Sequence, residues 1–284
     1  MFENPAKVCI ITDLDGTFLP KSKVPLPRDL AAVRRFEQAG GLFTIATGRT
    51  VQASRRYPEE LGLKRPIITF NGAGIWDPIA DELLYIHPLP ELAKEIAETI
   101  LADNPHVGSE VLCPRETWVV ADSETERVHI QLCGITPRFA PIHEAMAETW
   151  LKVLFAMHAG EMDAFVRYIE EKHFDGVKFV RSEKRYYELL PAGVSKGSAL
   201  QAYRELLGME GFTFVAVGDY DNDIEMLQAA DLGACPQNAA PSVKAVADLV
   251  LDRTCEEGAM EELIDRILLQ KGEPESCSMR SSCR

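Results

Sequence analysis

Two aspartates, Asp13 and Asp15, follow the apolar run Val8–Thr12 and belong to the short motif DLDGT. Residues i and i+2 of an extended chain point to the same side, so both carboxylates can approach one bound ion or one reacting phosphorus. Gly16 lets the backbone turn tightly behind them. A buried pair of this kind needs a cation, a shared proton or hydrogen bonds, and Mg²⁺ is the hard cation that prefers oxygen ligands. The spacing indicates a phosphoryl-transfer site, although Asp-x-Asp-Gly by itself also occurs in turns and calcium loops.

Donors for phosphate follow the next predicted strand, Leu42–Thr47. Thr47, Gly48 and Arg49 offer a hydroxyl, a backbone amide that a phosphate can approach closely, and a guanidinium. All three are donors for phosphoryl oxygens. The alternatives are a helix N-cap for Thr47 and a surface charge for Arg49.

Two further segments carry polar groups at the end of a strand or at the start of a helix. Asn71 and Gly72 follow the strand predicted over Ile67–Phe70 and form either an ordinary turn or an amide-and-backbone clamp on phosphate. Ser195 is expected to cap a helix whose first residue is Lys196. A lysine there opposes the helix dipole at a cost of about a few tenths of a kcal/mol or more, which favours a functional cation over a stray one.

A cluster of acids opens the helix predicted after the strand Phe212–Val217. It contains Asp219, Asp221 and Asp223, with Asn222 between the last two. Helix capping accounts for one of these carboxylates but poorly for three, so we interpret the cluster as a metal site. An EF-hand is disfavoured, because its loop needs Gly at its sixth position and Glu at its twelfth, and neither stands there.

The elements that position these groups follow a βαβ pattern, in which short β-branched runs alternate with amphipathic segments. The strands read as continuous apolar runs, as expected when helices cover both faces of a parallel sheet. Open α/β sheets bind ligands at the carboxyl ends of their strands, which is where these motifs lie. The core is predicted to contain strands at Val8–Thr12, Leu42–Thr47, Ile67–Phe70, Phe212–Val217 and near Leu232 and Leu249, with helices from Pro27, after Thr50, from Lys196, from Asn222 and over 258–269.

The regular βαβ pattern is interrupted between residues 81 and 188. Pro88 and Pro90 stand near the start of this stretch, and strand and helix segments are mixed in it, as in Thr117–Ala121, Val128–Leu132 and Asp163–Lys172. This predicts an α/β fold in which a Rossmann-like parallel-sheet core, residues 1–80 and 189–271, carries an inserted α/β cap domain, residues 81–188. Residues 272–284, rich in Ser, Gly, Pro and charge, are expected to form a flexible tail.

Composition and charge exclude several classes of function. The 284 residues are 46% hydrophobic and 26% charged, enough to bury a sizeable core. A formal net charge of −14 without a Lys/Arg stripe argues against a nucleic-acid backbone or a membrane as partner. Because we find neither a leader pattern nor about 18 consecutive apolar residues, we expect a cytoplasmic protein. Seven cysteines without Cys-x-x-Cys spacing fit reduced thiols, and Cys277 and Cys283 in the tail are interpreted as incidental.

Taken together, these residues resemble the haloacid dehalogenase superfamily, and specifically its Cof-type phosphatases with a large α/β cap. The similarity covers nearly the whole chain and rests on five motifs in the family's order: DLDGT at 13–17, ATGR at 46–49, ITFNGA at 68–73, GVSKG at 193–197, and GD at 218–219 with ND at 222–223. Two places depart from the family pattern. Tyr220 stands where a small residue is usual and is expected to crowd or line the substrate entrance, and PQNA at 236–239 replaces the more usual MGNA.

The resemblance implies a role for most of these residues. Asp13 would be the nucleophile that forms an aspartyl-phosphate, and Asp15 the general acid and then the base. Thr47 and Lys196 would hold the phosphoryl oxygens. Mg²⁺ would be bound by the Asp13 carboxylate, the Asp15 backbone carbonyl and Asp219, while Asn222 and Asp223 would orient phosphate and metal-bound water. Substrate-binding groups are predicted at Gly48, Arg49, Asn71, Gly72 and Asn222.

We therefore predict a magnesium-dependent phosphomonoesterase that hydrolyses a small phosphorylated metabolite, such as a sugar phosphate, through an aspartyl-phosphate. A mobile cap would close over the site and select the leaving group. Two alternatives stay open: a sugar phosphomutase of the same superfamily, and a non-catalytic regulator that binds a phosphorylated metabolite. Four polar residues of the insert receive no role, because a lone histidine or arginine in such a segment is usually structural: His158, Glu161, Arg138 and Arg181.

Overall fold

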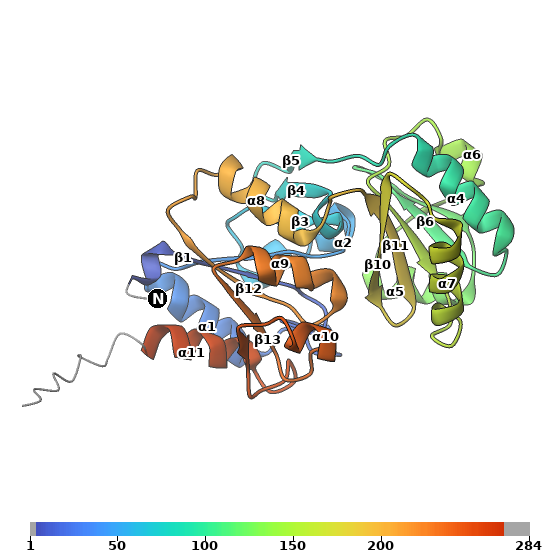
Figure 1. Ribbon diagram of the computed structural model, residues 1–284. Helices are drawn as coiled ribbons and strands as arrows, with labels where there is room; N and C mark the ends of the chain where they lie inside the picture. Colours follow the sequence, from blue (N-terminus) through green and yellow to red (C-terminus); the bar gives the residue numbers. More distant parts are fainter. Residues whose placement is uncertain (1–3, 270–284) are drawn as a thin grey trace, which may run out of the picture.

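The computed structural model describes residues 4–269 and consists of two units, each with its own sheet (Figure 1). The first unit is built on a five-stranded parallel sheet in the order β14-β13-β12-β1-β2. β1 is paired with β12 on one side and with β2 on the other, so the loop after β1 lies between the loops that follow these two strands. The strands are β1 (Val8–Thr12), β2 (Leu42–Ile45), β12 (Thr213–Val217), β13 (Leu232–Cys235) and β14 (Leu249–Val250).

Helices cover both faces of this sheet. Successive strand residues point to opposite faces: Val8 and Ile10 join a buried cluster with α1 and α11, whereas Cys9 and Ile11 join another with α8 and α9. Burial on both faces explains the uninterrupted apolar sequence of β1. The helices of this unit are α1 (Pro27–Gln38), α2 (Val51–Ser54), α3 (Tyr57–Leu61), α8 (Lys196–Leu206), α9 (Ile224–Ala229), α10 (Pro241–Lys244) and α11 (Ala259–Leu269), with 3-10 turns η1 (Pro5–Lys7), η2 (Phe70–Gly72) and η3 (Asp221–Asp223).

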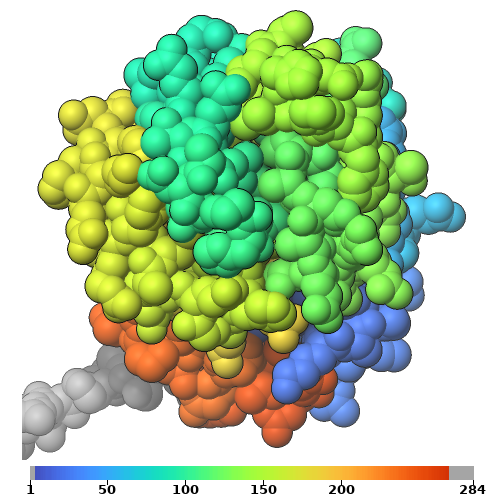
Figure 2. Space-filling model, turned by 90° about the vertical axis from the view of Figure 1, so that its right-hand side faces the viewer, coloured from blue at the N-terminus to red at the C-terminus, as the bar shows by residue number. Residues whose placement is uncertain are grey.

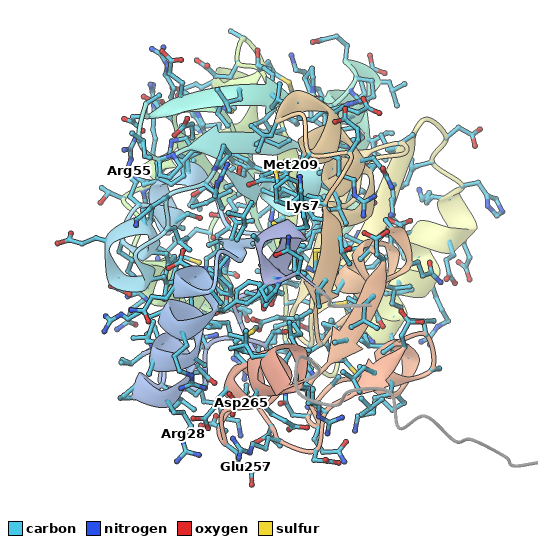
Figure 3. The ribbon with its side chains drawn as sticks, turned by 90° about the vertical axis from the view of Figure 1, so that its left-hand side faces the viewer. Lys7, Arg28, Arg55, Met209, Glu257 and Asp265 are labelled. Atoms are coloured by element: carbon cyan, nitrogen blue, oxygen red, sulfur yellow. The ribbon has the colours of Figure 1, made fainter. Side chains whose placement is uncertain are left out.

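α1 and α11 pack together on the face that points away from the second unit (Figure 3). Arg28 at the start of α1 donates from Nη1 to the backbone carbonyl of Glu257 at 3.2 Å. The buried side chain of Asp29 accepts a hydrogen bond from the backbone N of Glu261 at 2.7 Å. Asp29 therefore satisfies one of the free N–H groups in the first turn of α11.

A small antiparallel sheet adjoins the parallel one. It contains β3 (Ile67–Thr69), β4 (Gly74–Asp77) and β5 (Glu82–Ile86) in that order. The sequence predicts Ile67–Phe70 as a further parallel strand, and this is only partly right. A single parallel bridge, Ala46 to Ile68, joins this segment to the end of β2, whereas β3 otherwise pairs antiparallel with β4.

The second unit is inserted between β5 and α8 and has a six-stranded sheet in the order β10-β11-β9-β6-β7-β8. Neighbouring strands are antiparallel except β7 and β8. α4 and α7 pack on one face through residues such as Ile100 and Phe165. The elements are α4 (Leu92–Asp103), β6 (Gly108–Leu112), β7 (Thr117–Ala121), α5 (Glu124–Cys133), β8 (Arg138–Phe139), α6 (Ile142–Ala145), β9 (Lys152–Ala156), α7 (Met162–Lys172), β10 (Val177–Glu183) and β11 (Tyr186–Pro191).

The other face of this sheet lines a cavity at the boundary between the units. Odd positions such as Val111 and Val153 belong to the buried cluster under α4 and α7, whereas the even positions Glu110, Lys152 and Leu154 line the cavity. This is the alternation expected of strands with one face in a core. Viewed from the side of the second unit, that unit covers most of the first, whose blue and orange parts show along the lower edge (Figure 2).

These features confirm the predicted fold class, an α/β fold with a parallel-sheet core and a second, inserted sheet domain. The domain limits at 81 and 188 stay a prediction, and both fall at strands: β5 pairs with β4 in the first unit, and β11 runs to Pro191 in the second. Val128–Leu132 lies within α5. No helix within residues 4–269 combines the length and the apolar character needed to cross a membrane. The predicted tail, with Cys277 and Cys283, lies outside the described residues.

Candidate active site

Three carboxylates and one ammonium meet at the carboxyl ends of β1 and β12. Asp13 directly follows β1, and Asp219 and Asp223 come from the loop and 3-10 turn after β12. Lys196 is the first residue of α8, which Ser195 caps as predicted. Its Nζ lies 2.6 Å from Asp13 Oδ1 and 2.7 Å from Asp223 Oδ1 and is fully buried. The structure thus brings together four of the residues that the sequence predicted.

The loops hold these carboxylates through short polar contacts. Thr17 Oγ1 donates to Asp219 Oδ1 at 2.6 Å. Asp223 Oδ2 accepts the backbone N–H groups of Asp219 and Tyr220, at 2.9 and 3.1 Å. Gly16 has a φ of +88°, and a Cβ there would lie 2.5 Å from Asp219 Oδ2. Only glycine allows both this backbone conformation and the close approach of the two loops.

The electrostatics of the cluster show an excess of negative charge. Burial, more than the neighbouring carboxylates, raises the pKa of Asp13 to about 7, against the pull of Lys196. Burial likewise raises the pKa of Asp219 well above its ordinary value, with help from Asp13 and Asp223. Burial alone would lower the pKa of Lys196, but Asp13 and Asp223 raise it. The lysine therefore stays charged, and its ammonium group is the single positive charge beside three carboxylates.

This donor set fits a divalent cation. Carboxylate oxygens of Asp13, Asp219 and Asp223 lie within 4.8 Å of one another. Both oxygens of Asp223 already accept hydrogen bonds, one from Lys196 and the other from two backbone amides. Asp13 and Asp219 are therefore better placed than Asp223 to bind an ion directly, and oxygen ligands of this kind suit Mg²⁺.

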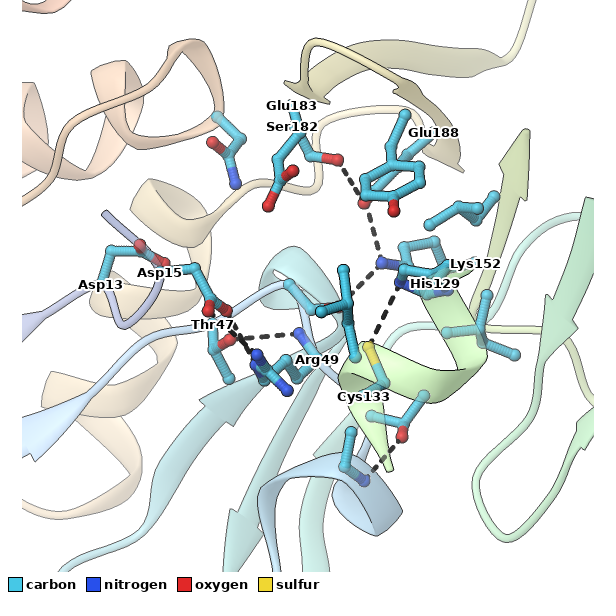
Figure 4. Close-up of a pocket in the computed structure, with 18 of the residues that line it drawn as sticks. Asp13, Asp15, Thr47, Arg49, His129, Cys133, Lys152, Ser182, Glu183 and Glu188 are labelled. Atoms are coloured by element: carbon cyan, nitrogen blue, oxygen red, sulfur yellow. Dashed lines mark hydrogen bonds and ion pairs between the residues drawn. The ribbon is translucent and has the colours of Figure 1, made fainter. Parts of the chain in front are cut away.

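Asp15 points to a different set of partners. Arg49 donates two hydrogen bonds to Asp15, from Nε to Oδ2 at 2.7 Å and from Nη2 to Oδ1 at 2.9 Å (Figure 4). Lys23 Nζ lies 2.6 Å from Oδ1. Burial alone would raise the pKa of Asp15, but Arg49 and Lys23 hold it well below its ordinary value. Arg49 is not the surface charge of the alternative interpretation, and Lys23 was missed because no motif marks it.

Thr47 and Gly48 line the same cavity as Asp13 and Asp15. Thr47 is buried, and its Oγ1 accepts a hydrogen bond from Arg49 N at 3.2 Å. It is not a helix N-cap, because Thr50 caps α2 by accepting from the backbone N of Ala53. The side chain of Thr47 is therefore available for the predicted contact with a phosphoryl oxygen.

The structure places Asn71 and Gly72 beside the cavity, and their role as a phosphate clamp stays a prediction. The Asn71 side chain donates from Nδ2 to Glu188 of the second unit and accepts from Asn222 Nδ2 at 3.0 Å. Gly72 has a φ of +102°, and a Cβ there would lie 2.1 Å from the Ser195 carbonyl oxygen. Neither residue lines the cavity, whereas Asn222 does. In this structure Asn71 joins the two units, and Gly72 permits the approach of its loop to the start of α8.

The second unit forms the opposite wall of the cavity, which has a volume of about 100 Å³. Lys152 donates from Nζ to the Gly48 carbonyl at 2.7 Å and lies 3.0 Å from Glu188 Oε2 (Figure 4). Ser182 Oγ donates to Glu188 Oε1 at 2.7 Å. Sequence analysis missed these residues; the alternation of β6, β9 and β11 was the signal that could have revealed them. The wall from the second unit contains Glu110, Leu112, His129, Leu132, Cys133, Ile135, Lys152, Leu154, Ser182, Glu183, Tyr186 and Glu188.

The polar residues of the insert that were left without a role lie elsewhere. Arg138 pairs with Glu144, Arg181 pairs with Asp163, and Glu161 accepts from the backbone N of His158. None of His158, Glu161, Arg138 and Arg181 lines the cavity, whereas Tyr220 does. Asn238 of the unusual PQNA segment donates to the Gly16 carbonyl at 2.7 Å and so steadies the loop after β1.

Comparison with known proteins places the chain in a family. A family model of the haloacid dehalogenase-like hydrolases matches residues 10–263. The chain is 26% identical over 254 residues to a 5-amino-6-(5-phospho-D-ribitylamino)uracil phosphatase, YitU, of Bacillus subtilis, covering 88% of this chain and 93% of that protein. It is 29% identical over 256 residues to the pyridoxal phosphate phosphatase YbhA of Escherichia coli, covering 85% and 92% of the two chains.

Solved structures share the fold. A haloacid dehalogenase-like hydrolase from Bacteroides thetaiotaomicron superposes with a TM-score of 0.78 at 24% identity, covering 91% of this chain and 98% of that one. A Thermotoga maritima protein gives a TM-score of 0.75 at 24% identity, with 91% and 96% covered. The resemblance inferred from the five motifs is thereby confirmed: the chain belongs to the haloacid dehalogenase-like hydrolases and is a phosphatase, a hydrolase acting on phosphoric monoesters.

Proposed function

We propose that this phosphatase is a Mg²⁺-dependent enzyme that hydrolyses a small phosphorylated metabolite through an aspartyl-phosphate on Asp13. One observation carries the proposal. Asp13 lies beside Lys196 and near Asp219 at the end of β1, and it lines a cavity whose opposite wall is formed by the second unit. A nucleophile, a fixed cation and space for a small leaving group are the parts that phosphoryl transfer needs.

In the first half-reaction a carboxylate oxygen of Asp13 attacks phosphorus, and the bond from phosphorus to the alcohol oxygen of the substrate breaks. Asp15 gives its proton to that oxygen, so a neutral alcohol leaves. We expect Lys196 and the Thr47 hydroxyl to stabilise the negative charge of the phosphoryl oxygens. A bound Mg²⁺ would supply Lewis-acid stabilisation of the same charge, held by Asp13, Asp219 and the Asp15 backbone carbonyl.

In the second half-reaction water attacks the phosphorus of the aspartyl-phosphate. Asp15 takes a proton from that water, inorganic phosphate leaves, and the Asp13 carboxylate is restored. The contacts of Asp15 with Arg49 and Lys23 favour its ionised form, which suits this step. For the first step Asp15 must carry a proton, and we expect Arg49 to move from Asp15 to the substrate's phosphoryl group, because a guanidinium binds either anion bidentately.

The substrate class rests on the cavity and on the relatives. The cavity of about 100 Å³ lies between the two units, with Lys152 and Glu188 of the inserted unit in its wall, which favours a small substrate over a polymer. The relatives are named as phosphatases of 5-amino-6-(5-phospho-D-ribitylamino)uracil, of pyridoxal phosphate and of HMP-PP, which are small phosphorylated compounds. We propose a substrate of that kind, including sugar phosphates. The free thiols Cys9, Cys113 and Cys235 support a reducing, cytoplasmic site of action.

Phosphate release from a panel of such compounds tests this function. We expect activity with Mg²⁺, none after EDTA and recovery on addition of Mg²⁺, with a mass increase of one phosphoryl group on Asp13 when the reaction is quenched early. Asp13→Asn should abolish both turnover and labelling. Asp29→Asn is the matched control, because Asp29 is also buried, lies outside the cavity and keeps an acceptor for Glu261 N.

The other outcomes identify the alternatives. Turnover that needs a bisphosphorylated activator would make the protein a phosphomutase. Binding of a phosphorylated metabolite without phosphate release would make it a regulator. Substantial phosphatase activity in a folded Asp13→Asn variant would contradict the role of Asp13.

A further inference from the structure

A second group of buried acids lies in the inserted unit and has no part in the reaction described above. Glu110 lies on β6, and Glu126 and His129 lie one turn apart on α5, which packs against that strand. His129 Nδ1 is 3.1 Å from Glu110 Oε1 and 3.9 Å from Glu126 Oε1. One donor atom from each residue can be chosen so that all three lie within 4.8 Å of one another.

The carboxylates of this group form no well-aligned hydrogen bond within the described part of the chain. Glu110 and Glu126 are both fully buried, and neither their four side-chain oxygens nor His129 Nδ1 has a hydrogen-bond partner of good geometry there, although Nδ1 lies 3.1 Å from Glu110 Oε1. Buried polar groups are almost always paired, and an unpaired buried charge costs several kcal/mol, on the order of the penalty for stripping an ion of water. These atoms therefore point to a missing occupant.

Other buried carboxylates of the same chain show what is usual. Asp29 accepts from a backbone N–H, Glu188 accepts from Ser182 and pairs with Lys152, and Asp223 pairs with Lys196. The group on β6 and α5 has instead one imidazole for two carboxylates. Burial, followed by the charge of Glu110, raises the pKa of Glu126 to about 7.

We propose that Glu110, Glu126 and His129 bind a divalent transition-metal ion, with Zn²⁺ as the representative case. Two carboxylates and an imidazole form a ligand set that suits Zn²⁺ or Mn²⁺ better than Mg²⁺. Two ligands of a tetrahedral Zn²⁺ lie about 3.3–3.6 Å apart when each bond is about 2.0–2.2 Å. The observed separations of 3.1 and 3.9 Å bracket that range.

The surroundings of His129 support this assignment. Its Nδ1 faces the two glutamates, while its Nε2 lies 3.3 Å from Cys133 Sγ, one turn further along α5 (Figure 4). A metal-binding histidine commonly uses its second ring nitrogen to hydrogen-bond a neighbour, which fixes the orientation of the ring. Tyr186 packs against the ring edge to face, with centroids 4.7 Å apart.

An ion at this site would tie α5 to the sheet of the inserted unit. Glu110 from the sheet and His129 from α5 line the cavity that also contains Asp13, as do Leu132 and Cys133 at the end of α5. The ion would thus fix a wall that contacts the organic part of the substrate, without touching the carboxylates at the end of β1. This site does not depend on the proposed Mg²⁺ chemistry, so each can fail alone.

Titration of the full-length protein with Co²⁺ in excess Mg²⁺ tests the proposal. Mg²⁺ occupies the oxygen-rich site at Asp13, while Co²⁺ reports an imidazole-containing site by its visible absorption. We expect the wild-type protein to bind a further equivalent of Co²⁺, Zn²⁺ to displace it, and Zn²⁺ to raise the melting temperature by mass action. Asp219→Ala should keep this Co²⁺ equivalent, because Asp219 belongs to the other site.

Variants of the ligands sharpen the result. His129→Asn should lose the Co²⁺ spectrum, and Glu126→Gln, which keeps the side-chain volume, should weaken binding at least about tenfold. His106→Asn is the matched control: its Nε2 lies 3.8 Å from Glu161 Oε1, but on the surface, and Co²⁺ binding should be unchanged. Should His129→Asn not fold, Glu126→Gln carries the comparison.

Two results would overturn the proposal. The first is a wild-type protein that takes up no Co²⁺ or Zn²⁺ beyond what Asp219→Ala removes. The second is a His129→Asn variant that binds Co²⁺ as the wild type does. In either case a proton shared between Glu110 and Glu126 would be the occupant instead.

Discussion

The two units bury carboxylates in opposite ways. At the end of β1, Lys196 lies between Asp13 and Asp223, and Thr17 and two backbone amides supply further donors. On β6 and α5 the carboxylates find, among residues 4–269, only a poorly aligned imidazole as a donor. In the first cluster Lys196 already compensates part of the negative charge, and an added ion would only balance the remainder. In the second cluster the compensation depends on a bound ion or proton.

The largest effect should follow removal of the fixed cation. Lys196→Met leaves Asp13 and Asp223 as uncompensated buried charges, so we expect a loss of about 3–5 kcal/mol of unfolding free energy together with loss of turnover. Urea unfolding monitored by circular dichroism measures the first quantity, and phosphate release the second. Asp223→Asn in the same chain should restore part of the stability, because it removes one of the two stranded charges.

The equivalent change in the other cluster should have the opposite sign. In EDTA, Glu126→Gln removes a buried carboxyl group whose charged form is already disfavoured by burial and by Glu110, so the variant should be as stable as the wild type or more stable. With Zn²⁺ present the order should reverse, because only the wild type gains the ion. If Glu126→Gln and Lys196→Met destabilise the metal-free protein equally, the contrast between the two clusters is wrong.

A smaller effect, confined to chemistry, is expected for Asp15. Asp15→Asn should lower kcat by about 10²–10⁴-fold, the range for loss of a general acid or base, without weakening Mg²⁺ binding, since the backbone carbonyl is unchanged. The loss should shrink for aryl phosphates, whose leaving groups need no protonation. Equal losses for aryl and alkyl phosphates would show that Asp15 is not the acid.

The pH dependence of stability should separate the clusters further. Asp13 has a folded pKa of about 7 against an ordinary value of 3.8, so between these values the folded protein holds a proton that the unfolded chain has lost. Its contribution to the unfolding free energy therefore falls as pH rises through this window. Glu126 behaves alike between 4.5 and about 7.

Melting temperatures in EDTA at pH 5 and pH 8 measure this slope. Mg²⁺ should remove the part of this slope that comes from Asp13, because the ion stabilises the ionised carboxylate. Asp13→Asn should remove the same part of the slope in the absence of metal. Glu126→Gln should reduce the slope equally well with or without Mg²⁺. A slope that neither variant changes would mean that other groups control it.

The sequence predicted the cluster at the end of β1 because its members occupy strand ends and a helix start. Apolar runs and Ser195 located β1, β12 and the start of α8, and parallel strands bring their carboxyl ends to one edge. Asp13, Asp219 and Lys196 therefore had to lie close together. The contact between Asn71 and Glu188 could not be predicted in this way, because it depends on how the inserted unit sits on the core.

The cluster on β6 and α5 shows where this kind of inference stops. Glu110 and Glu126 look like ordinary surface acids in sequence, and the spacing of Glu126 and His129 is common on exposed helix faces. Only the packing of α5 on the sheet buries them together. The alternation in β6 and β9 predicts which positions share a face but not what covers that face.

The smallest effect concerns the contact between the units. Lys152 is buried and joins Glu188 to the Gly48 carbonyl, so Lys152→Met should disturb the position of the inserted unit on the core and leave Glu188 without its cation. Gly48 adjoins the phosphate site, so we expect KM to rise by about tenfold, roughly 1.4 kcal/mol of binding free energy, with kcat little changed.

Lys178→Met is the matched control for this change. Lys178 also joins the units, through Glu225 at 2.6 Å, but the two side chains are 29% and 50% exposed, and ion pairs open to solvent contribute about 0–1 kcal/mol. KM should therefore stay within about twofold of wild type. Because both lysines cross the same boundary, a general loosening of the inserted unit would raise KM in both variants. A rise in Lys152→Met alone would show that the buried contact at Gly48, rather than the number of ion pairs, positions the inserted unit over Asp13.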